Sequence, residues 1–175
     1  MSALNRTPSN TNFLQPSKFI LAFNRLPTVQ YFCQSANLPG VSIGSAVHAT
    51  PLLDVPIAGN KLSYQEFKIT FYIDENILSW NELYKWFLAI AAPTKLQDRA
   101  TYNALQNSNS TKSSYYSDSN LTIMSALNNP ISRINFYRMY PISLSDIQFD
   151  TTQSADTIIT ADAVFRYEYF EITST

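Results

Sequence analysis

Few side chains in this sequence are of the types that catalysis requires, and their spacing does not bring them together. His48 is the only histidine, and the chain has no Gly-x-Ser-x-Gly motif that would supply a nucleophile for it. Asp74 and Glu75 are adjacent, so on a strand they point to opposite faces, and a strand end before a helix explains them better than a shared site. The sequence has no Gly-rich phosphate loop and no metal-ligand spacing. It therefore predicts a protein that is not an enzyme and needs no cofactor.

Cysteine usage and hydropathy place further limits on the kind of protein this is. Cys33 is the only cysteine, so neither an internal disulfide nor a thiolate metal cluster is available. The first ten residues contain no apolar signal core, and the longest apolar stretch, Trp86–Ala92, is too short to span a bilayer. We expect a soluble protein without a membrane partner, made and kept in a reducing cytoplasm.

The charge pattern gives no support to nucleic-acid binding. The net charge is -1, and the twelve basic residues are scattered along the chain rather than clustered. The segment Arg133–Arg138 alternates in the way an RNA-stacking strand would, but the basic balance that should accompany it is missing. Only 14% of residues are charged, while the chain holds 11 Tyr and 11 Phe. Such a surface suits extensive subunit contacts, and a large β core is an equally good interpretation.

The N-terminal part of the chain combines a polar segment with the first β pattern. Residues 1–16 are polar, contain two prolines and predict a flexible N-terminal arm. Residues 17–175 are predicted to form a single β domain. Lys18–Phe23 and Val29–Leu38 are candidate strands separated by a short turn, and together they predict a hairpin.

The segment 40–62 has a different pattern. It holds all three glycines and two prolines, and its apolar residues lack a clean period. This predicts a long extended loop or a projecting two-stranded ribbon. A long segment of this kind in a compact domain is usually functional or disordered, and its apolar content favours a partner over disorder.

A strand and a helix follow in the middle of the chain. Glu66–Asp74 alternates apolar and polar residues and predicts a half-buried strand. Ser79 and Glu82 form a capping-box pattern, with Ser79 as the cap. The helix is expected over Trp80–Ala92, with its apolar face against a sheet. The residues expected on that face are Trp80, Leu83, Phe87 and Ile90.

Further strands are expected in the last third of the chain, after a polar stretch at 94–119 that is compatible with a short helix at Asp98–Leu105. The expected strands are Leu121–Leu127, Ile131–Tyr140 ended by Pro141, Ile147–Phe149 and a long terminal strand over Ile159–Tyr169. About seven strands and one helix, without repeated βα units, predict a mainly β fold. The predicted architecture is a β-barrel or sandwich with one flanking α-helix and a long extended loop.

The order of these features resembles the tail-tube proteins of T4-like contractile phages, from about Lys18 to the C-terminus. The resemblance rests on short motifs in a particular order. They are the Cys33–Gly40 segment, Pro56–Gly59, the strand Phe67–Phe71 with the Ile73–Asn76 turn, the Trp80 to Trp86 helix, Tyr140–Pro141, Ile147–Asp150 and the terminal Phe165–Phe170.

The resemblance implies a structural subunit of the inner tail tube of a contractile phage. Six subunits would form a ring, and stacked rings would make a conduit through which DNA passes without specific binding. The implied partners are other copies of the chain, the tail sheath protein, and the baseplate and tape-measure proteins, in a virion tail assembled in the host cytoplasm. A baseplate tube initiator or a secretion-system tube subunit of the same fold is the alternative. A β-barrel binding module or enzyme of another class is a third interpretation.

Two sets of residues are predicted to carry out assembly. The extended apolar segment Val41–Leu62 should provide contacts between rings through Val47, Leu52, Leu53, Val55 and Ile57. The polar face of the terminal strand should lie at the lumen or the ring interface, because a channel for DNA should be neutral to acidic. Asp162 and Glu168 are the carboxylates expected there.

Overall fold

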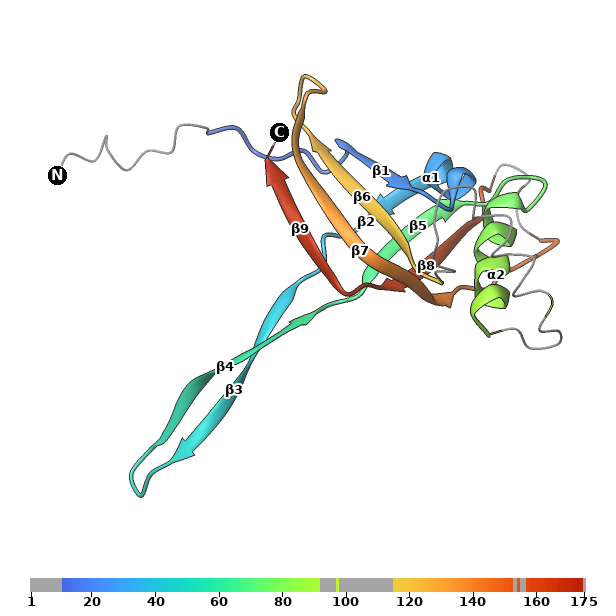
Figure 1. Cartoon of the computed structure of the whole chain (residues 1–175). Helices are drawn as coiled ribbons and strands as arrows, with labels where there is room; N and C mark the ends of the chain where they lie inside the picture. Colours follow the sequence, from blue (N-terminus) through green and yellow to red (C-terminus); the bar gives the residue numbers. More distant parts are fainter. Residues whose placement is uncertain (1–10, 92–96, 98–114, 153, 155–156, 175) are drawn as a thin grey trace.

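The computed structural model describes residues 11–91, 97, 115–152, 154 and 157–174, and this part of the chain is mainly antiparallel β-structure (Figure 1). The elements are β1 (Phe19–Phe23), α1 (Pro27–Phe32), β2 (Cys33–Ala36), β3 (Val41–Ala49), β4 (Asp54–Tyr64), β5 (Phe67–Tyr72), α2 (Leu78–Ala91), β6 (Ser117–Met124), β7 (Pro130–Leu144), β8 (Thr160–Arg166) and β9 (Tyr169–Ser174). The predicted fold class, mainly β with a flanking helix and an extended projection, is confirmed.

Strand β7 connects the two halves of the main sheet. The strand order is β1-β6-β7-β8-β5-β2, and β9 pairs with the first part of β7. The partner of β7 changes near Arg138: Tyr137 is opposite Tyr169 of β9, and Tyr140 is opposite Arg166 of β8. The sheet therefore bends at this point, and both halves contribute to one core.

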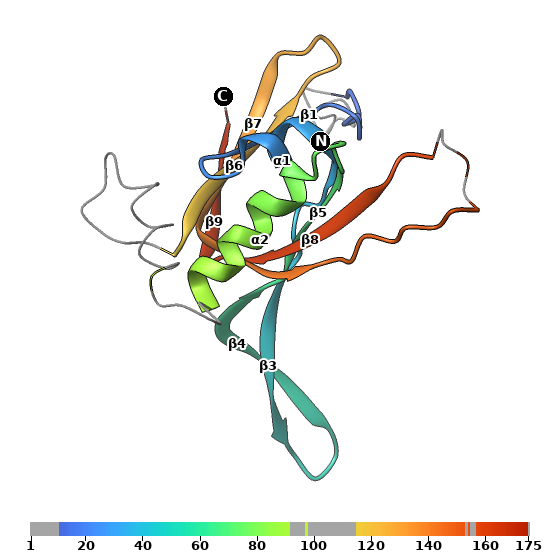
Figure 2. The same cartoon turned by 90° about the vertical axis from the view of Figure 1, so that its right-hand side faces the viewer.

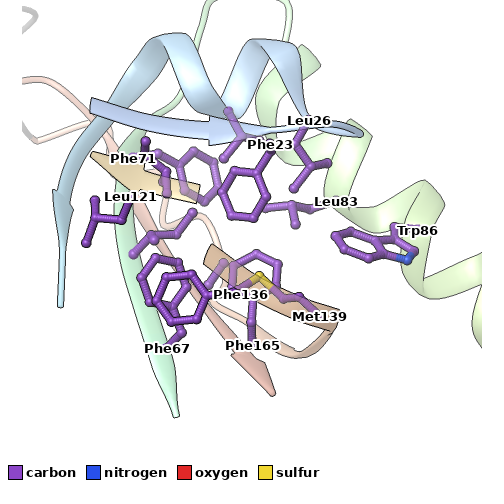
Figure 3. Packing of buried hydrophobic residues seen from close by; sticks show 14 of the residues in the cluster. Phe23, Leu26, Phe67, Phe71, Leu83, Trp86, Leu121, Phe136, Met139 and Phe165 are labelled. Atoms are coloured by element: carbon purple, nitrogen blue, oxygen red, sulfur yellow. The ribbon is translucent and has the colours of Figure 1, made fainter. Parts of the chain in front are cut away.

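The core is dominated by aromatic side chains from both halves of the sheet (Figure 3). Phe67 lies with its ring centroid 4.7 Å from that of Phe136 and 6.3 Å from that of Phe165. Phe165 also contacts Phe23 and Trp86, at 5.4 and 6.1 Å between centroids. Because β5, β7 and β8 each send a fully buried phenylalanine to this cluster, their registers are fixed relative to one another.

Helix α2 covers one end of the folded sheet (Figure 2). Its buried face overlaps the predicted one. Leu83 and Trp86 are fully buried, and the indole Nε1–H of Trp86 donates a hydrogen bond to the Tyr115 carbonyl at 2.8 Å. Trp80 and Ile90 are partly buried and pack against the core, whereas Phe87 is half-buried outside it. The buried residues of the helix are Ser79, Leu83, Trp86 and Ala89, so of the four predicted residues only Leu83 is fully buried.

The predicted capping box is wrong. Asp74 caps α2: its two carboxylate oxygens accept hydrogen bonds from the backbone N–H groups of Leu78 and Ser79, at 3.0 and 2.9 Å. Glu82 does not reach back to the helix start. Its carboxylate instead accepts hydrogen bonds from the hydroxyl and backbone N–H of Thr28, at 2.6 and 3.2 Å, and so ties α2 to α1.

The predicted N-terminal hairpin is also wrong. Residues 27–32 form helix α1, which begins with Pro27 in its first turn and buries Val29, while β1 pairs with β6 and β2 pairs with β5. Alternating apolar residues over so short a run fit one turn of helix as well as a strand. Helix α1 also protects the sheet edge, because the Gln30 side chain accepts a hydrogen bond from the Phe23 N–H at 2.9 Å.

The strands in the last third of the chain differ from the prediction at several places, including β6, which begins at Ser117 and ends at Met124. Pro141 does not end β7, because beyond Met139 this strand has only β8 beside it in the described part, and an edge position tolerates a residue without an N–H. Residues 147–149 pair with no strand among the described residues. The terminal run divides into β8 and β9 at Tyr167–Glu168, where the sheet bends. Within β8, Ala161, Ala163 and Phe165 are buried.

One predicted segment is described only in part and another not at all. Residues 11–16 are exposed and belong to no helix or strand, so the flexible arm over 1–16 stays a prediction. The short helix expected at Asp98–Leu105 lies outside the described residues.

Trp86 is expected to carry a large share of the stability of the fold. Trp86→Ala should lower the free energy of unfolding by roughly 3–5 kcal/mol, the usual cost of truncating a fully buried aromatic side chain. Urea unfolding followed by far-UV circular dichroism measures this. Lys85→Ala, an exposed position on the same helix, is the matched control and should change stability by less than about 0.5 kcal/mol. Equal effects of the two variants would contradict this packing.

The Asp74 cap should make part of the stability depend on pH. Burial raises the pKa of this carboxyl, but the hydrogen bonds from Ser79 and Leu78 outweigh it, and the pKa lies below its ordinary value of 3.8. Asp74→Ala should cost about 1 kcal/mol near neutral pH. Because the folded-state pKa is lowered, the difference should shrink as the pH falls below 3.8 and through the folded-state value. Urea midpoints of both proteins between pH 7 and pH 2.5 test this, and a constant difference would rule it out.

Candidate assembly surfaces

Strands β3 and β4 form a two-stranded ribbon that projects away from the sheet (Figures 1 and 2). Of the two alternatives left open by the sequence, a loop or a ribbon, the ribbon is correct. Within the described part of the chain the two strands pair only with each other. Every residue of β3 is exposed, and only two of the eleven residues of β4 are partly covered. The ribbon therefore has no core of its own inside one subunit.

Apolar side chains occupy both faces of the ribbon. Residues directly opposite each other on paired strands share a face, and successive pairs alternate between faces. Val47 is opposite Pro56, whereas Val55 and Ile57 are opposite His48 and Ala46 on the other face. The ribbon can therefore contact apolar surfaces on two sides at once.

The five residues predicted to mediate contacts between rings all lie on this ribbon and are exposed. The exposed fractions are 98% for Leu52, 69% for Leu53, 64% for Val47, 52% for Ile57 and 41% for Val55. Leu52 and Leu53 lie at the tip, in the turn between the strands. Exposed leucines at the end of a projection are costly in water, so these residues are suited to burial against another molecule.

The tip has a defined conformation. The Thr50 hydroxyl accepts a hydrogen bond from the Leu53 N–H at 3.1 Å and also donates one to the Leu53 carbonyl. The Thr50 N–H donates to the same carbonyl at 3.2 Å. A turn closed by its own hydrogen bonds presents the two leucines in one arrangement, which lowers the entropy cost of docking them.

The two strands approach each other closely where Gly44 and Gly59 meet. A Cβ atom added to Gly59 would lie 2.3 Å from the Gly44 carbonyl oxygen, so no other residue fits at that position without moving the backbone. The register also shifts here, because two steps along β3 from Ile43 to Ser45 correspond to four steps along β4. Such irregularities increase the local twist of paired strands.

Aromatic residues fix the base of the ribbon to the main sheet. The ring centroid of Tyr64 lies 5.8 Å from that of Tyr167 and 5.4 Å from that of Phe170. The Tyr167 hydroxyl donates a hydrogen bond to the Gln65 carbonyl at 2.9 Å. Burial, together with the nearby Tyr64, raises the pKa of Tyr167 to about 12, so this hydroxyl remains a donor. The direction in which the ribbon leaves the subunit is thereby defined.

The two carboxylates expected at the lumen or ring interface lie at separate places. Asp162 is exposed on β8 and accepts a hydrogen bond from the Thr70 hydroxyl at 2.7 Å. Glu168 lies between β8 and β9 and forms an ion pair with Arg138 at 3.4 Å. The structure does not bring the two into one site, and their role in assembly stays a prediction.

An exposed cluster at the bend of β7 was not anticipated from the sequence. The Arg138 guanidinium lies 4.7 Å from the ring centroid of Tyr116, beside Tyr140, Tyr167 and Glu168, around a shallow pocket of about 300 Å³. Tyrosine and arginine are the residues most often found at the centre of protein interfaces. The cluster depends on where β7 bends, and no local pattern of residue types marks that point.

The described residues of the connection between β7 and β8 form a second projection, which we call the β7–β8 arm (residues 145–152, 154 and 157–159). Its two legs leave the sheet beside α2 and separate (Figure 2). An open cleft of about 750 Å³ lies between them and the adjoining end of β8. Its lining includes hydroxyl side chains, the acidic residues Asp146, Asp150 and Asp162, and the exposed apolar residues Phe149 and Ile158. The sequence signal for this surface was the strand predicted at Ile147–Phe149.

The described residues do not provide the groups for metal chemistry. No set of three or more His, Cys, Asp or Glu side chains among them is placed to hold a metal ion. His48 lies on the exposed ribbon, opposite Val55.

No helix within the described ranges is both long enough and apolar enough to cross a membrane.

Comparison with known proteins finds similarity to proteins of phage tails. The sequence model of a family described as "Phage tail tube protein" matches residues 7–173. The tail tube terminator protein of Enterobacteria phage T4 is 24% identical over 168 residues, which cover 92% of this chain and 89% of that protein.

Solved structures share the fold at low sequence identity. The tube-terminating cap of the anti-feeding prophage superposes with a TM-score of 0.66 at 13% identity over 100% of both chains. The sheath–tube complex of the extracellular contractile injection system PVC, in the extended state, gives 0.61 at 13% identity over 100% of this chain and 99% of the other. The six-fold symmetrised baseplate of the anti-feeding prophage gives 0.53 at 10% identity, over 95% and 96% of the two chains.

Proposed function

Because the chain belongs to the phage tail tube protein family, we propose that it is a structural subunit that forms rings in the tail tube of a contractile particle. The observation that carries this proposal is the ribbon β3–β4. It exposes apolar residues on both faces and at its tip, and the described part of its own subunit leaves them uncovered. A surface of this kind belongs in an assembly, and in this fold it would contact the next ring along the tube.

Ring formation would use the edges of the main sheet. Strands β1, β2 and β9 each have a partner strand on one side only in the described part. A head-to-tail interface that repeats around an axis closes into a ring and covers such edges with neighbouring subunits. We propose a ring of six copies, as the resemblance to tail-tube proteins implies.

Within the tube, we propose that the ring sits at the end, as a terminator. The support is the 24% identity to the T4 tail tube terminator protein, which extends over nearly the whole of both chains. The repeating subunit of the inner tube is the second candidate, because the tube of an extracellular contractile injection system has a similar fold. A baseplate tube initiator and a secretion-system tube subunit remain alternatives with less support.

The proposed partners follow from this position. The ring would contact the tube below it and the surrounding sheath, and a subunit nearer the baseplate would also meet the baseplate and tape-measure proteins. DNA would pass through the lumen without specific binding, which suits a chain with a net charge of -1 and no basic cluster in its sequence.

Copy number separates the two candidate positions. A terminator should be present at one ring per particle, and a repeating subunit should match the sheath protein in number. Quantitative mass spectrometry of purified particles, with the sheath protein as the internal reference, is expected to give a ratio far below one. A ratio near one would replace the terminator with the repeating subunit and leave the tube role intact.

The ribbon tip is expected to be required for joining a ring to a tube. The double substitution Leu52→Ser and Leu53→Ser should leave the unfolding midpoint unchanged, because both side chains are exposed. The variant rings should stay in the supernatant when they are sedimented with tail tubes, whereas wild-type rings should pellet.

A matched control for this assay is available at the opposite end of the molecule. Leu127→Ser replaces a leucine that is 82% exposed in the turn between β6 and β7, and it should pellet like the wild type. If the tip variant also pellets like the wild type, the ribbon does not carry the contact between rings.

A further inference from the structure

The two legs of the β7–β8 arm have features of a site that could bind an extended segment as an added strand. Pairing between β7 and β8 ends at Leu144 opposite Ala163, and one further backbone hydrogen bond joins the Ser145 N–H to the Asp162 carbonyl. Beyond this point the described residues of the two legs form no ladder with each other. The first leg nevertheless carries Ile147 and Phe149 in the alternation typical of a strand. An added strand would give these backbone groups partners.

The cleft between the legs favours a particular chemistry. None of the described residues that line it is basic, and three of them are aspartates. Phe149 and Ile158 contribute apolar surface and are 76% and 67% exposed. The best occupant is therefore an extended segment that has a positive charge, no acidic residue and at least one large apolar side chain.

The N-terminal segment of the chain has this chemistry. Residues 1–16 contain Arg6 and no acidic residue, and the first Asp or Glu of the whole chain is Asp54. Phe13 and Leu14 are 96% and 64% exposed, and residues 11–15 belong to no helix or strand. Residues 9–15 lie between Pro8 and Pro16, so each can contribute an N–H and a carbonyl to a strand pair.

The two features lie at opposite ends of the molecule. In Figure 1 the chain leading into β1 lies on the same side as the turn between β6 and β7, whereas the β7–β8 arm leaves the sheet beside α2. A contact between the N-terminal segment of one copy and the arm of the next copy would run head to tail. This is the heterologous arrangement that rings and stacks require.

We propose that the N-terminal segment of one copy inserts between the two legs of the β7–β8 arm of a second copy, with residues 11–15 as the added strand. The backbone of the inserted segment pairs with the leg that carries Ile147 and Phe149. Phe13 and Leu14 cover Phe149 and Ile158, and the segment brings no acidic residue into a cleft lined by three aspartates. This deepens the proposed function, because it adds a second contact between copies that is independent of the ribbon.

Cysteine cross-linking in the full-length chain tests the contact. The variant with Leu14→Cys and Ile158→Cys, oxidised at pH 8, is expected to give a ladder of covalent multimers on a non-reducing gel. The native thiol does not interfere, because burial raises the pKa of Cys33 to about 11 and the thiol stays protonated at this pH. The wild type and the two single variants should therefore give no ladder. Leu14→Cys combined with Leu127→Cys, an equally accessible position at the other end, is the matched control.

The outcomes separate this inference from the proposed function. No ladder, a ladder equal to that of the control pair, or a disulfide confined to single chains would overturn the inference. Negative-stain microscopy of the wild type judges ring formation independently: rings without a ladder reject only this contact, and an absence of rings contradicts the proposed function. Asp146→Lys, added to the cross-linking pair, should lower the yield of multimers at low salt. An unchanged yield of multimers would show that the negative charge of the cleft does not contribute to binding of this segment.

Discussion

The bend of β7 at Arg138 is the constraint on which the rest of this structure depends. Arg138 has φ 54°, a left-handed conformation that is uncommon outside glycine, and its N–H donates a hydrogen bond to the Asp118 carboxylate at 2.9 Å. At this residue β7 leaves β9 and takes up β8. Because of the bend, two phenylalanines face the same core. Phe136 precedes the bend on β7, and Phe165 lies on β8, the strand that pairs with β7 beyond the bend. A straight β7 would leave two half-buried sheets in place of one closed core.

Much of the fold could be predicted because the strands that build the core carry their periodicity locally. Phe67, Ile69 and Phe71 alternate with polar residues, and all three are buried in β5. The helix was found from its apolar spacing, although Leu83 is the only residue of its predicted face that is fully buried. The cap was misassigned because Asp74 and Ser79 are both good capping residues, and only the preceding strand end decides which is used. Helix α1 was missed because six residues are too few to distinguish a helix period from a strand period.

The assembly surfaces were predictable to different degrees, for a physical reason. The ribbon could be located because exposed apolar residues without a period are anomalous in one subunit. Asp162 and Glu168 were grouped because they share a face in a single long strand, but the chain bends between β8 and β9 and separates them. The cleft of the β7–β8 arm lies where the described residues of two segments do not pair. A strand pattern such as Ile147–Phe149 does not show whether a partner strand lies beside it.

The close approach of Gly44 and Gly59 has a consequence for how an exposed ribbon survives before assembly. A flat two-stranded ribbon with free backbone groups along both sides would be a template for indefinite strand addition. The shift of two residues in the register, together with the backbone contact that excludes a side chain at Gly59, coils the ribbon so that its edges do not stay in one plane. The faces of the ribbon can still bind other surfaces, whereas its edges do not readily pair with further strands. An unassembled subunit can therefore stay in solution with its leucines exposed. It binds a complementary surface rather than pairing edge to edge with a second ribbon.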